Sequence, residues 1–203
     1  MTDWSVEAEE EEEEEDDAAT PLTPDERDGL IPTYITNRAE LNEAEQLNIM
    51  QADGWAFRRK RDVLDRTFLI GLHKRMFGQV WRWAGAFSRQ ANRRIGVDHW
   101  LIEPELHQLL DNVRFWIENS TFSPDEIVLR FHHRLTQIHA FPNGNGRHAR
   151  MAADLLAVQL GLERLSWGRA NLVEAAETRR AYVAALRAAD DHDMGPLLAF
   201  ART

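Results

Sequence analysis

The stretch His139-Ala-Phe-Pro-Asn-Gly-Asn-Gly-Arg-His-Ala-Arg150 is the most informative part of this sequence. It follows one amphipathic segment and opens another, so we expect it to form the turn between two helices. Such a turn presents backbone N–H groups at a helix N-terminus, where a phosphate binds well. Arg147 and Arg150 stand three residues apart, which places both guanidinium groups on one face of the second helix. Because arginine binds phosphate through paired hydrogen bonds, the stretch predicts a polyphosphate site.

The order of these residues resembles the signature of the Fic (filamentation induced by cAMP) family, His-x-Phe-x-(Asp/Glu)-Gly-Asn-Gly-Arg-x-x-Arg. Seven of the eight signature positions match, namely His139, Phe141, Gly144, Asn145, Gly146, Arg147 and Arg150. The eighth position is Asn143, where the family usually carries a carboxylate. On this resemblance the chain is identified as a member of the Fic family, and the Fic fold is expected.

Length and composition are compatible with a single sizeable core. The chain has 203 residues and no cysteine, which excludes disulfides and thiolate chemistry. Its N-terminus has no basic segment followed by an apolar one, and the chain has no run of about 18 apolar residues. We therefore expect a cytoplasmic protein that neither carries a secretion signal nor spans a membrane.

The net charge of −10 belongs to a short acidic tail. Ten of the 34 acidic residues lie between Glu7 and Asp17, and the remaining 24 equal the 24 Lys and Arg residues. A run of like charges repels itself and cannot bury apolar surface, so we expect residues 1–20 to be disordered. Their acidity argues against nucleic acid as a partner.

Hydrophobic periodicity predicts an all-α fold, a helical bundle with one small β-hairpin. Helical segments are expected over 40–51 (stopping near Gly54), 63–81, 104–117, 124–138, 151–161, 171–189 and 192–201. The clearest helix start is Ser123-Pro-Asp-Glu126, which combines an N-cap, a proline in the first turn and a glutamate three residues on. The hairpin is expected around residues 87–97. Three parts follow: the tail over 1–20, an N-terminal segment over 21–54, and a Fic domain over 55–203.

The resemblance implies a protein adenylyltransferase, which transfers AMP from ATP to a Ser, Thr or Tyr hydroxyl of a target protein or of the enzyme itself. His139 is the predicted base, since an unperturbed pKa of about 6.5 leaves much of it neutral at cellular pH. Arg147 and Arg150 are predicted to hold the β- and γ-phosphates.

The glycine-rich turn supplies the rest of the predicted phosphate site. Gly144, Asn145 and Gly146 would form a nest of backbone N–H groups around the α- and β-phosphates. Glycine permits the positive φ angle and close backbone approach that such a nest requires. Phe141 is interpreted as a core anchor for the turn.

Asn143 leaves the metal and the transferred group open. In Fic enzymes the carboxylate at this position helps to hold Mg²⁺, so Mg²⁺ or Mn²⁺ is the expected cofactor, with ATP as substrate. An amide oxygen is a neutral and weaker ligand than a carboxylate. Three outcomes stay open: weaker metal binding at Asn143, replacement by another acid in space, or altered chemistry. The alternatives to AMP transfer are transfer of another phosphate-containing group and a catalytically degenerate nucleotide-binding regulatory module.

The resemblance also implies a target-positioning flap upstream of the motif. In Fic proteins a β-hairpin flap aligns the target chain by strand pairing. Arg94, Ile95, Gly96 and Val97 are the predicted flap residues, and an ordinary connecting hairpin is the alternative.

Many Fic proteins are restrained by an inhibitory helix with the pattern (Ser/Thr)-x-x-x-Glu-(Gly/Asn). Thr36 and Glu40 reproduce the spacing, although Leu41 breaks the last position. Glu40 is therefore the predicted inhibitory residue. Its other interpretation is a first-turn carboxylate that complements the helix dipole.

A zinc site is not expected from His132, His133 and His148. Their spacing matches no zinc motif, and no cysteine supports them.

Overall fold

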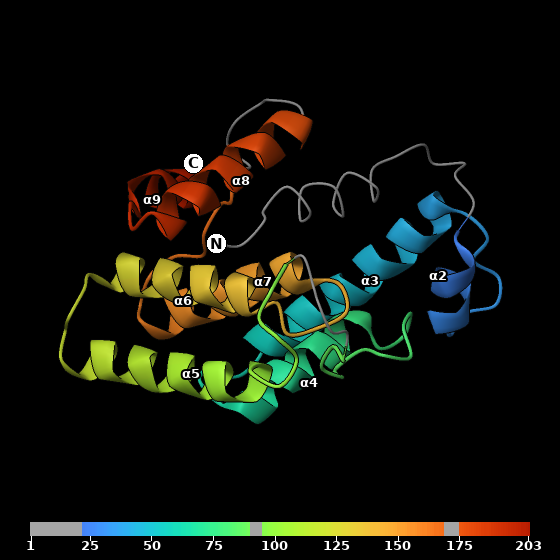
Figure 1. Ribbon diagram of the computed structural model, residues 1–203, viewed down its shortest axis with the longest axis horizontal. Coiled ribbons are helices and arrows are strands. Elements are labelled where there is room, and N and C mark those ends of the chain that lie inside the picture. Colours follow the sequence, from blue (N-terminus) through green and yellow to red (C-terminus); the bar gives the residue numbers. More distant parts are fainter. Residues whose placement is uncertain (1–21, 90–94, 169–174) are drawn as a thin grey trace.

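The structure is a computed structural model that describes residues 22–89, 95–168 and 175–203 (Figure 1). These residues form eight α-helices and one isolated β-bridge, between Leu30 and Trp81. The helices are α2 (Pro24–Gly29), α3 (Arg38–Phe57), α4 (Arg66–Phe77), α5 (Ile102–Glu118), α6 (Pro124–Ile138), α7 (Asn145–Gln159), α8 (Ala175–Asp190) and α9 (Gly195–Arg202). The predicted all-α fold is confirmed.

Helices α6 and α7 lie side by side at the centre of the bundle (Figure 1). Helix α5 packs on α6, and the α3–α4 pair packs on α7. The α8–α9 pair covers α6 on the side away from α5. The loop that joins the two central helices is the motif, so packing on both sides determines where its residues lie.

Helix α6 begins and ends as its sequence dictates. Ser123 is the N-cap, and its Oγ accepts the Glu126 N–H at 3.3 Å, while Pro124 occupies the first turn. The helix ends at His139, which adopts the left-handed conformation with φ +49° and ψ +56°. This ending turns the chain sharply into the motif loop.

Helix α3 is longer than the sequence predicted. It was expected to stop near Gly54 but continues to Phe57, because Ala52 and Ala56 are buried against the bundle. Gly54 faces open space and adds no packing of its own, so it does not end the helix. The predicted boundary between residues 54 and 55 therefore falls inside α3.

Helix α7 buries Met151 and Leu155, whereas Val158, in its last turn, is 45% exposed.

Three predicted features fall wholly or partly outside the described residues. They are the acidic tail over 1–20, residues 90–94 of the predicted hairpin, Arg94 included, and the first residues of the helix predicted over 171–189. The flanking residues 87–89 and 95–97 are described and are not in strands.

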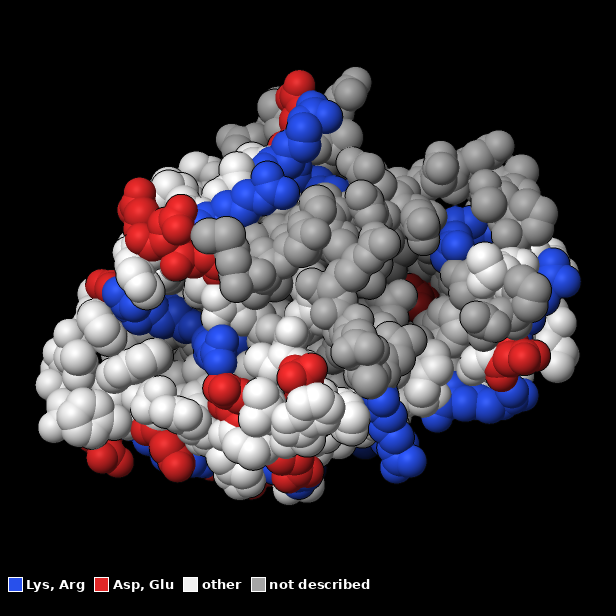
Figure 2. Space-filling model, viewed as in Figure 1, with Lys and Arg blue, Asp and Glu red and all other residues white. Residues whose placement is uncertain are grey.

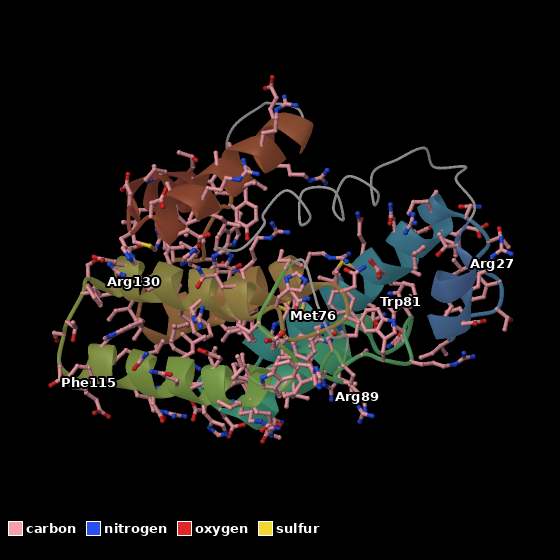
Figure 3. All side chains as sticks on the ribbon, viewed as in Figure 1. Arg27, Met76, Trp81, Arg89, Phe115 and Arg130 are labelled. Carbon is pink, nitrogen blue, oxygen red and sulfur yellow. The ribbon has the colours of Figure 1, made fainter. Side chains whose placement is uncertain are left out.

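Charges of both signs are interspersed over the described part of the face in Figure 2. This agrees with the near-neutral composition outside the acidic tail. Within the described ranges, no helix is both long and apolar enough to cross a membrane. Figure 3 contrasts the interior Met76 on α4 with Phe115, which points away from α5 and is 58% exposed.

Candidate active site

The motif loop is closed by the side chain of the first residue of α7. The Oδ1 atom of Asn145 accepts the Phe141 N–H, and its Nδ2 donates to the Phe141 carbonyl, both at 2.9 Å. Both residues are buried. Since this amide side chain is turned toward Phe141, Asn145 would reach a phosphate through its backbone N–H.

His73 on α4 supports the motif loop through contacts with Phe141 and Asn143. The sequence did not identify this residue. Its ring stacks on Phe141 with the centroids 3.7 Å apart. Its Nδ1 accepts the Gly85 N–H at 3.0 Å, so Nε2 carries the proton and donates to the Asn143 carbonyl at 3.1 Å. Burial lowers the pKa of His73 well below its usual value, with a smaller contribution from the neighbouring His148. His73 is therefore neutral and rigidly held.

Position 144 requires glycine because the backbone has a positive φ angle and because a neighbouring side chain leaves no room for a Cβ atom. Its φ is +76°, and a Cβ atom there would lie 2.5 Å from Cζ of Phe77. The residue caps α7, and the His148 N–H bonds to its carbonyl at 2.9 Å. The N–H groups of the residues between them, 145–147, lie in the first helical turn, where the helix provides no acceptor. Two residues of the predicted cradle, Asn145 and Gly146, lie in this turn, whereas the Gly144 N–H is bonded to Oδ1 of Asn143. Phosphate binding by the cradle stays a prediction.

The two motif arginines line the same groove. It lies between α3 and α7, measures about 1040 Å³, and continues from Arg147 and Arg150 to Asp154, Arg164 and Trp167. The guanidinium carbon of Arg150 lies 5.2 Å from the ring centroid of Tyr182, a residue of α8. The structure thus brings together the two guanidinium groups that the sequence placed on one helical face.

Arg147 is held by a carboxylate that sequence reasoning did not identify. Its Nη1 donates to Oε2 of Glu45 at 2.7 Å, and Trp81 Nε1 donates to the other oxygen of Glu45. Glu45 is buried, and these two partners compensate for the burial of its charge, since a carboxylate is rarely buried unless it is paired. A charged residue on the buried stripe of α3, one turn after Leu41, was the signal in the sequence.

Glu40 has a different environment. Its Oε2 accepts the Thr36 N–H at 2.7 Å and the Thr36 hydroxyl at 3.1 Å. Its own N–H bonds to Oδ1 of the N-cap residue Asn37. The bonds from Thr36 lower the pKa of Glu40. In this structure Glu40 caps the start of α3, and its inhibitory role stays a prediction.

His139 lies between the two described ends of the predicted flap. The Ser88 N–H donates to the Ala140 carbonyl at 2.9 Å, and the Val97 N–H donates to the Ile138 carbonyl at 3.3 Å. His139 itself is buried. Backbone bonds therefore fix the segments before and after residues 90–94 on either side of the predicted base.

Ile95 and Gly96 complete the described flap residues. Ile95 is buried, and Gly96 has a φ of +92°, a conformation that glycine adopts readily. Phe87, just before the flap, packs on Phe141 with ring centroids 5.7 Å apart.

The donors around Asn143 do not make a magnesium site by themselves. Its Oδ1 is a neutral amide oxygen that already accepts the Gly144 N–H. Over the ranges that the structure describes, no three His, Asp or Glu side chains are grouped as metal ligands. Metal binding at Asn143 stays a prediction.

The histidines considered for zinc have separate partners. His132 Nε2 lies 3.1 Å from the Tyr182 hydroxyl, and His148 Nε2 lies 3.0 Å from the Leu69 carbonyl. His133 pairs with Asp190 at 2.8 Å.

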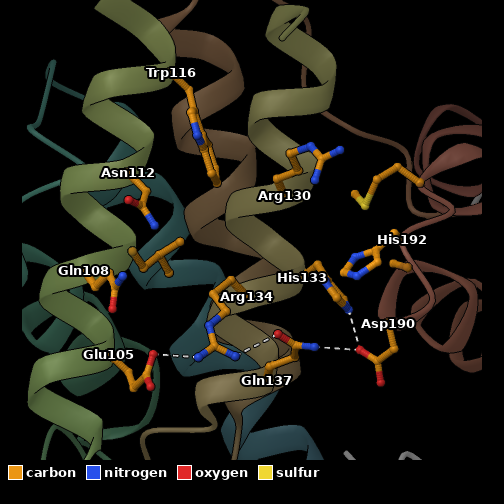
Figure 4. Close-up of a pocket in the computed structure, with 13 residues that line it drawn as sticks. Glu105, Gln108, Asn112, Trp116, Arg130, His133, Arg134, Gln137, Asp190 and His192 are labelled. Carbon is orange, nitrogen blue, oxygen red and sulfur yellow. Dashed lines mark hydrogen bonds and ion pairs between the residues drawn. The ribbon is translucent and has the colours of Figure 1, made fainter. Parts of the chain in front are cut away.

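A second groove of about 430 Å³ lies on the other side of α6, between α5 and α8 (Figure 4). A chain of polar contacts crosses it, from Glu105 through Arg134, Gln137 and Asp190 to His133. Each carboxylate there is matched by a cation or a polar donor. We interpret this chain as a contact between helices.

Residues 63–157 match the model of the Fic/DOC family. No curated protein matches the sequence. Among solved structures, the N-terminal Fic domain of an effector protein from Bartonella sp. AR 15-3 is 16% identical, with a TM-score of 0.66 over 86% of this chain and 89% of that one. BepC from Bartonella tribocorum, solved with bound AMPPNP, is 18% identical, with a TM-score of 0.64 over 83% and 87%.

Fic-1 from C. elegans is 22% identical, with a TM-score of 0.60 over 85% of this chain. The present chain spans 50% of that Fic-1 chain. At these identities the likenesses establish the fold, and they agree with the all-helical architecture.

The buried histidines predict a specific loss of stability in acid. Burial lowers the pKa of His148 to about 4. As the pH falls below about 6.5, the unfolded chain binds the proton first, so the free energy of unfolding decreases. By pH 5, His148 alone should reduce it by about 2 kcal/mol. His73 and His132, whose pKa values are also lowered by burial, act in the same direction.

Urea unfolding at pH 7.5, 6 and 5 measures this effect. The variant His148→Gln keeps an N–H donor for Leu69 and should show a smaller decrease in unfolding free energy between pH 7.5 and 5. His107→Gln, at an exposed position on α5, is the matched control and should follow the wild type. If the unfolding free energy depended on pH equally in His148→Gln and in the wild type, His148 would not be a cause of the loss of stability in acid.

Proposed function

Because residues 63–157 belong to the Fic/DOC family, we propose that the protein is a Fic-type transferase that uses ATP as a protein adenylyltransferase. It would transfer AMP to a hydroxyl side chain of a target protein or of itself. The observation that carries the proposal is the shared groove of Arg147 and Arg150 beside the first turn of α7. The AMPPNP bound to BepC, a protein of the same fold, supports a nucleotide as the ligand.

In the proposed reaction the target hydroxyl attacks the α-phosphorus in line with the leaving pyrophosphate. His139 takes the hydroxyl proton as the oxygen bonds to phosphorus and the bond to the bridging oxygen breaks. The first-turn N–H groups of α7, at Asn145 and Gly146, face the charge that develops on the phosphate. Arg147 and Arg150 neutralise the β- and γ-phosphates.

Mg²⁺ or Mn²⁺ is proposed to enter the site with ATP. Magnesium is commonly bound through substrate phosphates and few protein ligands, so a site with the amide of Asn143 is compatible with weak binding.

The target chain is proposed to pair with the flap that includes Ile95, Gly96 and Val97, and Arg94 belongs to the same prediction. The bonds from Ser88 and Val97 to the backbone around His139 support this arrangement. A target strand that pairs with the flap would place its hydroxyl side chain near His139, the predicted base.

Restraint by α3 is proposed as the regulation of this site. Glu40 is the residue that the sequence pattern favours. Glu45, on the same helix, is in contact with a motif arginine, at 2.7 Å from Arg147. A carboxylate on that guanidinium competes with a phosphate for the same donors.

Asn143 favours a second candidate, a regulatory nucleotide-binding module without transfer activity. A neutral side chain at this position weakens metal binding but leaves the cradle and the arginines in place.

Labelled ATP distinguishes these possibilities. The protein is incubated with cell lysate, Mg²⁺ or Mn²⁺, and ATP labelled on either the α- or the γ-phosphate. We expect label from the α-position on protein, with at least a 100-fold decrease in His139→Ala because the base is removed. Transfer from the γ-position would instead indicate phosphorylation. Bound ATP without transfer of either label would favour the regulatory module.

Asn143→Asp is the matched variant for the metal. It adds a charged oxygen ligand, so half-maximal transfer should occur at a lower Mg²⁺ concentration than in the wild type.

Glu45→Gln tests the restraint by α3. Glutamine keeps an acceptor for Trp81 but removes the charge that binds Arg147, so ATP should bind about tenfold more tightly. Glu40→Gly is compared in the same titration and in the labelling assay. A larger gain in Glu40→Gly would assign the restraint to Glu40, and weaker ATP binding in Glu45→Gln would contradict a restraining role for Glu45.

A further inference from the structure

Arg150 is in contact with a part of the chain that lies beyond the family match. Its guanidinium carbon lies 5.2 Å from the ring centroid of Tyr182 on α8. Tyr182 is only 2% exposed, and a cation over an aromatic face interacts more strongly where water is excluded. The match ends at residue 157, so α8 is an addition to the matched segment.

Tyr182 is itself held from two sides. Its hydroxyl lies 3.1 Å from Nε2 of His132, a fully buried residue on α6. The ring of Phe200 on α9 packs against the Tyr182 ring, with centroids 5.6 Å apart. The aromatic ring beside Arg150 therefore has little freedom to move.

The state of His132 determines the direction of this hydrogen bond. Burial, and next the positive charge of Arg150, lower the pKa of His132 well below its usual value. A neutral imidazole has one donor and one acceptor nitrogen, and the Tyr182 hydroxyl can donate or accept, so this hydrogen bond forms in either tautomer of His132.

The contacts return to α7 by way of Trp167. The His132 and Trp167 rings lie 4.6 Å apart, and Trp167 Nε1 donates to Oδ1 of Asp154 at 3.0 Å. Asp154 stands four residues after Arg150 on α7, so both lie on one face of the helix. Contacts thus run from Arg150 through Tyr182, His132 and Trp167 to Asp154, and they begin and end on α7.

We propose that Tyr182 is a positioning residue for Arg150, and that it holds the guanidinium in place for the terminal phosphates of ATP. This inference rests on the proposed function, in which Arg150 binds those phosphates. A guanidinium interacts with an aromatic ring through its face. Its N–H donors lie in its own plane, so they can still bond to phosphate. Arg150 lines the groove, as Trp167 and Asp154 do.

A nucleotide comparison separates positioning from general stability. Dissociation constants for ATP and for AMP are measured in the wild type, Tyr182→Leu, Arg150→Ala and the double variant. AMP lacks the phosphates that Arg150 would bind. We expect Tyr182→Leu to weaken ATP binding about tenfold and to change AMP binding less than twofold. In the Arg150→Ala background, Tyr182→Leu should have no further effect on ATP.

Phe200→Leu is the matched control, because it removes another ring that packs on Tyr182. It should lower the melting temperature as Tyr182→Leu does, yet leave the ratio of ATP to AMP affinity within twofold of the wild type. An equal loss of ATP and AMP binding in Tyr182→Leu, additive effects with Arg150→Ala, or an ATP-specific loss in Phe200→Leu would each overturn the proposal.

A second set of variants preserves the shape of the core. Tyr182→Phe keeps the ring, so its ratio of ATP to AMP affinity should stay close to that of the wild type. A fluorinated phenylalanine at the same position withdraws electron density from the ring face and should weaken ATP binding selectively. Unchanged ATP affinity in the fluorinated protein would overturn the proposal even if Tyr182→Leu did not fold.

The same titrations distinguish this proposal from the proposed function. A wild-type protein that fails to bind ATP would overturn both. ATP binding that depends on Arg150 but not on Tyr182 would overturn the positioning role alone.

Discussion

The double hydrogen bond between the Asn145 amide and the Phe141 backbone is the contact on which the site depends. It joins the first part of the motif loop to the start of α7 and fixes the path of the residues between them. Gly144 then has to approach Phe77 without a side chain, and His73 stacks on the Phe141 ring. With the loop fixed, the first turn of α7 presents its N–H groups in a constant direction, as anion binding requires.

The surroundings of the loop are polar but carry little charge. His73 and His148 are neutral because burial lowers the pKa of each. His73 donates a hydrogen bond to the Asn143 carbonyl, and His148 donates one to the Leu69 carbonyl. Buried polar groups that are fully bonded make a site rigid, whereas unbonded ones would destabilise it. Charged side chains lie instead at the groove, whose lining includes Arg147 and Arg150 and, further along, Asp154 and Arg164, which pair with each other.

Local signals in the sequence predicted the helical fold, the start of α6 and the motif, since each depends on residues within one or two turns. The extension of α3 past Gly54 was missed because the burial of Ala56 depends on the neighbouring helices. Glu45, His73 and Tyr182 were missed for a similar reason. Glu45 and His73 contact the motif from positions 102 and 70 residues away in the chain, and no local pattern marks such partners. A glutamate on the buried stripe of α3 was the one available sign.

The central claim is that the first turn of α7 binds the phosphates of a nucleotide. Backbone amide chemical shifts of Asn145 and Gly146, followed by NMR during titration with ATP and in parallel with adenosine, test it most directly. The two amides should shift with ATP and stay unchanged with adenosine, because the nucleoside carries no phosphate. Unchanged amides at saturating ATP, or equal shifts with adenosine, would contradict the claim.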